Sequence, residues 1–169
     1  MKKIVFLFIF INFSCFAQDI FNLARHGEVI KMEALIKQGV DINKKNKSGF
    51  TALILSCYYN NEEMVLLLLN KKADTEIMSK MGTALLAASY KGFNKIVKML
   101  IKHKANINAI DSKGTSALHY ACFSQNIELI KILLHHHVKT DLKDVNNKTA
   151  LDYAIEFNNI EIIKLLQTN

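Results

Sequence analysis

The chain has 169 residues, of which 50% are hydrophobic and 22% charged, and this content excludes an intrinsically disordered protein. Six glycines and no proline leave too few turn residues for a collagen-like, proline-rich or loop-dominated all-β protein, so a helical protein is the first expectation. The formal net charge of +7 permits an acidic partner without identifying one.

The first 17 residues have the order of a secretory signal peptide. Two lysines precede an uninterrupted apolar run at residues 4–11, and small or polar residues follow. A membrane span needs about 20 apolar residues, and this run breaks at Asn12. We expect cleavage after Ala17 and a periplasmic or secreted mature chain. Lipid anchoring through Cys15 is the alternative, although Asn12 stands where a lipobox usually carries leucine.

A period of about 33 residues runs through the rest of the chain. The strings TALILSC, TALLAAS, SALHYAC and TALDYAI begin at Thr51, Thr83, Ser116 and Thr149, and a leucine-rich stretch follows each of them. A first unit without its leading turn starts at Asp19. Self-similarity at this period is typical of stacked repeats, because one helix pair cannot bury its apolar face alone.

Each full unit is expected to be a pair of helices. The Thr or Ser that opens each string is predicted to be the N-cap of the first helix, where its hydroxyl can accept a hydrogen bond from a free backbone N–H. Nine residues further on, the turn between the two helices favours residues that tolerate a positive φ angle. These are Asn60, Gly92, Gln125 and Asn158, with Gly27 in the first unit.

This pattern resembles the ankyrin repeat, with the family pattern GxTPLHxAAxxGH followed by xxIVxLLLxxGADVN. The resemblance covers residues 19–167 in five units and implies an all-α solenoid of stacked helix-turn-helix pairs joined by hairpin-like turns. The expected domain is 18–169, with repeats at about 18–45, 46–77, 78–110, 111–143 and 144–169. Alanine replaces the family's proline in all four full units, the family's histidine survives only as His119, and the third unit has lost one residue at its turn near Gly82.

Polar residues on the terminal units predict a complete stack with solvated ends. They are Asp152, Glu156, Asn158, Asn159, Glu161 and Lys164 in the last unit, and Arg25, Glu28, Lys31 and Glu33 in the first.

The histidines His103 and His135–His137 raise the possibility of a metal site. Consecutive helical residues do not share a face, however, and His137 holds the helix-ending position that Gly39, Lys72 and Lys104 hold elsewhere, where a cation suits the helix dipole. His136 shares a repeat position with His103, so a site between adjacent repeats is a second interpretation. We expect no metal.

Cys57 and Cys122 occupy the same repeat position two units apart. Helices pack at roughly 8–10 Å, which puts these thiols beyond disulfide reach. We expect both to be buried as small packing residues. The sequence contains no nucleophile elbow, phosphate-binding glycine loop or HExxH motif, so neither an enzyme nor a cofactor is expected.

The resemblance implies that partners bind the turn tips and the exposed positions seven and eight residues after each cap. In this chain the predicted contact residues at the helix positions are Tyr58, Tyr59, Tyr90, Lys91, Phe123 and Phe157, and those at the tips are Phe50, Lys47, Lys80 and Lys113. Aromatic residues are efficient contacts because they bring large area with few torsions to immobilise. The alternative is that these aromatics only cover the first-helix layer.

The predicted function is an exported, non-catalytic protein–protein interaction module with an unknown protein partner, for which the lysines favour acidic character. Nucleic acid is not expected as a partner, because the basic excess is modest and export separates the protein from the cell's nucleic acid. A metal-handling or enzymatic role through His103 and His135–His137, and structural self-association, stay open as alternatives.

Overall fold

The computed structural model describes the backbone of residues 13–168 and the side chains from Ile20 onward. In this part of the chain the structure is helical, with two isolated β-bridges and no strand. The helices are α1 (Phe13–His26), α2 (Val29–Lys37), α3 (Ala52–Tyr58), α4 (Glu62–Asn70), α5 (Ala84–Lys91), α6 (Asn94–Lys102), α7 (Ala117–Phe123), α8 (Ile127–His135), α9 (Ala150–Glu156) and α10 (Ile160–Gln167).

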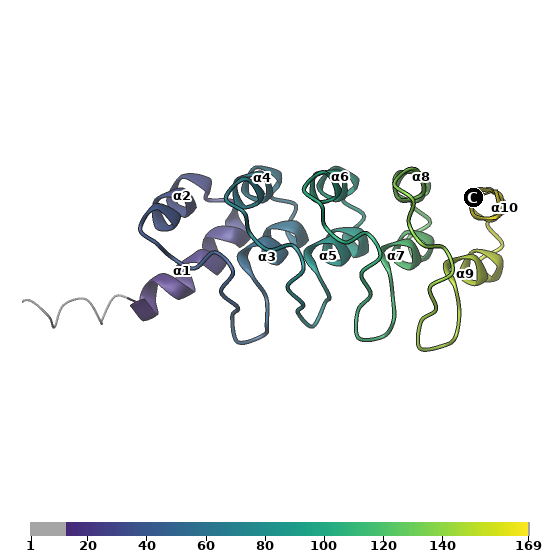
Figure 1. Ribbon diagram of the computed structural model, residues 1–169, viewed down its shortest axis with the longest axis horizontal. Coiled ribbons are helices and arrows are strands. Elements are labelled where there is room, and N and C mark those ends of the chain that lie inside the picture. Colours follow the sequence, from purple (N-terminus) through teal and green to yellow (C-terminus); the bar gives the residue numbers. More distant parts are fainter. Residues whose placement is uncertain (1–12, 169) are drawn as a thin grey trace, which may run out of the picture.

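Consecutive helices form five pairs that stand side by side in a row (Figure 1). The first helix of each pair (α1, α3, α5, α7, α9) belongs to one layer and the second helix (α2, α4, α6, α8, α10) to the other. The long turns between pairs project beyond the layer of first helices. The predicted all-α solenoid of stacked helix pairs is confirmed.

The first helices pack more closely on one another than the second helices do. Small residues explain the difference, because Ala52, Ala84 and Ala117 are fully buried on the first helices. The second helices bring larger side chains to the core, such as Met64, Leu100 and Leu129. The repeated apolar positions therefore stack into one continuous core that runs the length of the row.

The predicted N-caps are confirmed at all four positions. The side chain of each accepts a hydrogen bond from the backbone N–H three residues on, at Thr51, Thr83, Ser116 and Thr149. Two caps are reciprocal: the side chain of His119 accepts from the Ser116 N–H, and that of Asp152 accepts from the Thr149 N–H. These bonds satisfy backbone donors that would otherwise lack partners at a helix start.

Three turn positions recur with positive φ angles, one of them within the long turns at Gly49, Gly82, Gly114 and Asn147. The position between paired helices does so as predicted, at Gly27, Asn60, Gly92, Gln125 and Asn158. The position after the second helix also does so, at Gly39, Lys72, Lys104 and His137. The sequence predicts only charge complementarity to the helix dipole at this position. The structure shows that the residue also adopts the left-handed backbone conformation, which costs a non-glycine residue roughly 1 kcal/mol.

A short polar side chain closes each long turn, at Asn46, Ser79, Asp111 and Asp144. The Asp111 carboxylate accepts hydrogen bonds from the backbone N–H groups of Lys113 and Thr115, at 2.8 and 2.9 Å. Consecutive turns are also joined, since Asn108 Oδ1 accepts from the Lys139 N–H at 2.7 Å. The turns are therefore tied structures and not loose connections.

The turn at residues 71–83 is the short one that the sequence predicts. Its Gly82 has a φ of +81° and directly precedes the cap Thr83, whereas in the first turn Phe50 separates Gly49 (φ +81°) from the cap. The lost residue is therefore the one at the Phe50 position. The shorter turn closes through the Ser79 hydroxyl, which accepts from the Met81 N–H.

The predicted signal peptide falls largely on residues 1–12, which lie outside the described residues. The helix α1 is described from Phe13, and cleavage after Ala17 stays a prediction. Across residues 13–168, no helix combines the length and the apolar character needed to span a membrane.

The polar surface predicted for the last unit is only partly present. Glu156 and Glu161 are exposed as expected, but so are Ile155 and Ile160. The predicted polar surface of the last unit is therefore present but interrupted by these two exposed aliphatic side chains.

Candidate binding surface

Aromatic side chains form a continuous row across α5, α7 and α9. We call these five residues the aromatic row: Tyr90, Tyr120, Phe123, Tyr153 and Phe157. Successive ring centroids lie 5.5, 6.2, 4.6 and 6.5 Å apart. The first three contacts are edge-to-face, a geometry that contributes about 0.5–1.5 kcal/mol beyond area burial. The rings therefore support one another as a preformed ledge.

Three of the five rings in the aromatic row face solvent. The exposed fractions of Tyr90, Phe123 and Phe157 are 54%, 37% and 45%, whereas Tyr120 is half-buried and Tyr153 is buried. Part of the row lines an open pocket of about 400 Å³, whose wall consists of Tyr90, Lys91, Tyr120, Phe123 and Ser124. The exposed position of Tyr90 agrees with a contact role and not with a core role.

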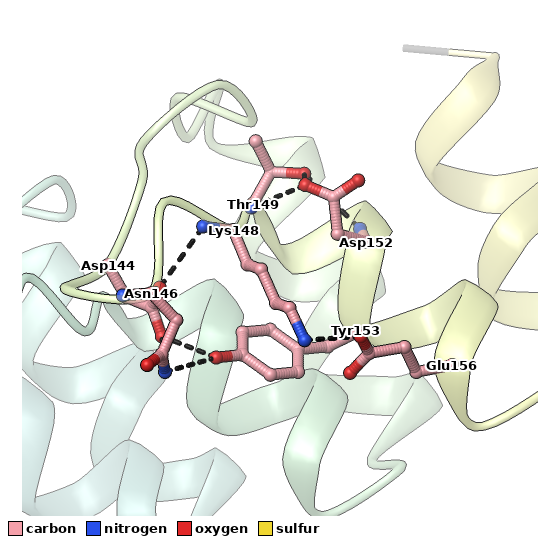
Figure 2. Close-up of polar contacts among 7 residues, drawn as sticks. All are labelled: Asp144, Asn146, Lys148, Thr149, Asp152, Tyr153 and Glu156. Carbon is pink, nitrogen blue, oxygen red and sulfur yellow. Dashed lines mark hydrogen bonds and ion pairs between the residues drawn. The ribbon is translucent and has the colours of Figure 1, made fainter.

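Aspartates of the long turns hold the two inner tyrosines in place. The Tyr120 hydroxyl donates to Asp111 Oδ2 at 2.7 Å, and the Tyr153 hydroxyl donates to Asp144 Oδ2 at 2.5 Å. Figure 2 shows the second of these bonds, with the Asn146 amide also donating to the Tyr153 hydroxyl at 3.0 Å. Each tyrosine thus ties a turn tip to the first helix that follows it.

These bonds fix the protonation of both partners. Burial raises the pKa of the Tyr120 hydroxyl, and the hydrogen bond to Asp111 raises it further, so the phenol remains a neutral donor. Desolvation raises the pKa of Asp111, but the hydrogen bonds from Tyr120 and from two backbone N–H groups outweigh it. The pKa of Asp111 therefore lies below its ordinary value.

The other predicted helix residues lie beside the aromatic row. Lys91 Nζ lies 4.8 Å from the centroid of the Tyr58 ring, and Tyr59 packs edge-on against Tyr58 at 5.3 Å. Tyr59 is exposed, whereas Tyr58 is only half-exposed because of these two neighbours. Phe50 is also half-buried and packs against the core. Tyr58 and Phe50 therefore offer less free surface than the sequence predicts.

Lysines on the two sides of the row differ in pairing. The turn lysines Lys47, Lys80 and Lys113 are exposed and form no ion pair within the described residues, although Lys148 pairs with Glu156. Lysines of the second helices pair with the neighbouring unit: Lys95 with Glu62, Lys98 with Glu128 at 3.1 Å, and Lys131 with Glu161 at 3.5 Å. The turn tips therefore carry uncompensated positive charge, as do Lys102 and Lys164 on the second helices.

Comparison with known families accounts for the repeated pattern. A family model described as ankyrin repeats (3 copies) matches residues 20–111 and, again, residues 85–169. Together the two matches span nearly the whole described chain. The chain belongs to the ankyrin-repeat family. Ankyrin repeats are in general protein–protein interaction modules and are typically non-catalytic. A comparison with curated proteins found no match.

The one histidine that this ankyrin chain retains from the family pattern has a structural role. His119 is buried, and its Nδ1 accepts from the Ser116 N–H at 3.2 Å. Its Nε2 lies 3.1 Å from the Lys148 carbonyl oxygen and donates to it in the corresponding tautomer. The ring therefore links the cap of one repeat to the turn of the next.

The histidines considered for metal binding do not converge. His135, His136 and His137 are exposed, and His103 Nδ1 bonds the Met99 carbonyl oxygen of its own helix at 2.8 Å. No group of three or more His, Cys, Asp or Glu side chains with metal-binding geometry occurs among the described residues.

Cys57 and Cys122 are free and buried, as predicted. Burial raises the pKa of the Cys57 thiol and raises that of Cys122 to about 12. Both thiols are therefore protonated, inert packing residues in the folded ankyrin stack.

Sequence reasoning missed Tyr120 and Tyr153, the two inner members of the aromatic row. A signal was present: both lie four residues after a cap and therefore one helical turn before the predicted contact positions. The matching residues in the two preceding repeats are Leu55 and Ala87, so the repeat pattern by itself marks the position as ordinary core.

Proposed function

We propose that this chain is an exported, non-catalytic ankyrin module of five repeats that binds an acidic protein segment. The contact surface consists of the aromatic row and the lysine-bearing turn tips beside it. The close packing of the first helices favours a stack that curves with the first helices on its concave side. An extended segment of a partner can lie there along the aromatic row.

The aromatic row is the observation that carries this proposal. Three of its rings are exposed although each is locked against a neighbour, so binding would immobilise little that is not already fixed. The unpaired lysines Lys80 and Lys113 lie at the adjoining tips, whereas Lys95, Lys98 and Lys131 of the second helices pair with glutamates. Aromatic anchors with uncompensated positive charge favour an acidic partner.

Export rests on the order of residues 1–17 and is tested by the mass of the native protein. We expect a chain that begins at Gln18 in the envelope or secreted fraction. A recovered chain that still carries Met1, or a diacylglycerol on Cys15, contradicts this part of the proposal.

Partner binding is tested by capture from an envelope extract with single-residue variants. Tyr90→Ala should keep the fold, since Tyr90 is exposed, and should weaken capture by about 30-fold, the effect of a central anchor worth about 2 kcal/mol. Leu66→Ala is the matched control, because Leu66 is comparably exposed but lies on the second helix α4. Equal capture by both variants contradicts the proposed surface.

The turn lysines are tested by kinetics. Lys80→Glu and Lys113→Glu should slow association and reduce its dependence on salt, with little change in the dissociation rate, since they act by steering. Lys95→Glu is the control, because Lys95 already pairs with Glu62 on the other side of the stack. An unchanged association rate in both turn variants contradicts an acidic partner.

A further inference from the structure

The open pocket in the aromatic row lies where the first helices α5 and α7 stand side by side (Figure 1). We call it the α5–α7 pocket, and its wall consists of Tyr90, Lys91, Tyr120, Phe123 and Ser124. Its volume of about 400 Å³ lies within the range of natural ligand pockets, which is roughly 300–1,000 Å³. The pocket therefore has room for a side chain of a bound partner.

A small residue opens this pocket, at a position where the other full repeats carry a large one. Eight residues after the cap, the four full units have Tyr59, Lys91, Ser124 and Phe157. In the last unit Phe157 stacks on Tyr153, with ring centroids 6.5 Å apart and an interplanar angle of 28°. Tyr120 corresponds to Tyr153, but within the described residues it has two edge-to-face neighbours and no stacked ring. The pocket is thus open where a ring is present one repeat further on.

The backbone is the same at this position in the two repeats. Ser124 has φ and ψ angles of −85° and −1°, and Phe157 has angles of −80° and 0°. The Ser124 hydroxyl bonds within its own helix, to the carbonyl oxygens of Tyr120 and Ala121 at 2.9 and 3.3 Å. The open space therefore follows from the side chain at this position and not from a different turn.

The rings of the pocket wall are arranged to receive a further ring. The interplanar angle is 78° between Tyr90 and Tyr120, and 81° between Tyr120 and Phe123. A guest ring that stacks on Tyr120 is then edge-on to both neighbouring rings. Stacked and edge-to-face geometries are both favourable for aromatic pairs, and an aliphatic guest gains neither of them. The wall therefore favours an aromatic side chain.

The polar groups of the pocket favour a carboxylate beside that ring. The Lys91 ammonium lies over the Tyr58 ring and forms no ion pair within the described residues. The Tyr90 hydroxyl has no hydrogen-bond partner in the same part of the chain and can donate. Asp111 is already occupied, since it accepts from the Tyr120 hydroxyl and from two backbone N–H groups. A cationic guest would therefore meet the positive charge of Lys91 without a free carboxylate to balance it.

We propose that the α5–α7 pocket binds one aromatic side chain of the partner, and that a carboxylate beside this aromatic residue in the partner pairs with Lys91. This inference rests on the proposed function, because it specifies the anchor residue of the acidic partner segment. The bound ring lies against Tyr120 as Phe157 lies against Tyr153. Ser124 determines specificity, since its small side chain leaves the space that the ring occupies.

Selection from a phage-displayed library of random dodecapeptides on the immobilised full chain tests this pocket. We expect enriched peptides that carry Phe, Tyr or Trp next to, or one residue away from, Asp or Glu. Ser124→Phe should still enrich acidic peptides but without the aromatic residue, because its own ring fills the pocket. Ser124→Ala is the matched control, which keeps the pocket open and should select the same motif as the unaltered chain. Circular dichroism verifies each fold, and Ser124→Leu replaces Ser124→Phe if the latter does not fold.

Titration of one enriched peptide, made synthetically, measures the contacts. Its affinity should fall by about 30-fold on Ser124→Phe and by a similar factor when alanine replaces its aromatic residue. The two changes together should cost little more than either alone, since both remove the same contact. Lys91→Gln and the replacement of the peptide's neighbouring carboxylate by an amide should be non-additive for the same reason.

The outcomes separate this inference from the proposed function. Enrichment of acidic peptides without an aromatic residue, enrichment of aliphatic residues in its place, or the same motif selected by Ser124→Phe would overturn the pocket assignment and leave the acidic partner standing. Additive losses in the peptide titrations would overturn the assigned contacts. Failure to enrich acidic peptides at all would contradict the acidic partner and the pocket together.

Discussion

Positive φ angles recur at fixed turn positions, yet the demand for glycine differs among them. Lys72, Lys104 and His137 adopt φ angles of 65°, 66° and 56° without glycine. Gly114 is more constrained, because a Cβ there would lie 2.9 Å from the Lys143 carbonyl oxygen. The next turn cannot easily withdraw, since the Val145 N–H donates to the Lys113 carbonyl at 2.8 Å.

We therefore expect Gly114→Ala to lower the free energy of unfolding by about 1–3 kcal/mol, from the strained φ and the backbone clash together. The matched control is Gly39→Ala, where φ is also positive but nothing lies within 4 Å of the added Cβ. Urea denaturation followed by circular dichroism measures both. Equal losses of unfolding free energy in the two variants would show that the close approach of the Lys143 carbonyl to Gly114 does not affect stability.

The Asp111 carboxylate makes the stability of its turn depend on pH. Its pKa is lowered in the folded chain, so its contribution is present above the unfolded pKa of about 4 and is lost as the pH falls through the folded pKa. We expect the urea concentration at the midpoint of unfolding to decrease when the pH is lowered below about 4. This decrease should be smaller in Asp111→Asn. Asparagine fits this site, as Asn46 shows in the first turn. Lys113→Ala, which leaves the carboxylate in place, should keep the full acid dependence.

Each helix pair depends on its neighbours for burial. The second helices are nine residues or fewer and would not be stable alone in water. Their apolar faces supply the stability, and the fully buried Leu68, Leu100 and Leu133 repeat at one position through three consecutive pairs. The three inner pairs, α3–α4, α5–α6 and α7–α8, should therefore be sensitive to truncation, because each has a neighbour on both sides.

Leu100→Ala should lower the free energy of unfolding by about 2–5 kcal/mol through lost burial and a cavity. Leu66→Ala removes the same atoms from an exposed position on α4 and should cost much less. Chemical denaturation of the two variants compares them directly, and similar losses would contradict the packing described for α6.

The stack as a whole is held by contacts between neighbouring pairs, and its cooperativity depends on the strength of those contacts. Cys57 on α3 and Cys122 on α7 report on two separated places in the row, and both are fully buried. Each thiol becomes reactive only when its own surroundings open.

If the stack unfolds as one unit, both thiols should react with a thiol reagent at the same slow rate. A Cys15→Ser chain isolates these two thiols, and mass spectrometry after timed labelling measures each. Cys57→Ser and Cys122→Ser chains identify the signals. Reductant should not change stability, since the two cysteines are unpaired. Early labelling of one thiol would show that the row unfolds in parts.

The sequence by itself determined the repeat, the helix pairs, the caps and the buried positions, because each follows from local chemistry that recurs at a fixed period. Thr51 and Ser116 cap their helices for the same reason. The repeat position of Leu100 is apolar in each inner unit and is buried by the neighbouring pairs. Only the tertiary structure decided which side chains of different units meet. The aromatic row requires Tyr120 of α7 to reach Tyr90 of α5. Contacts between units depend on helix spacing and turn geometry, which no single repeat encodes.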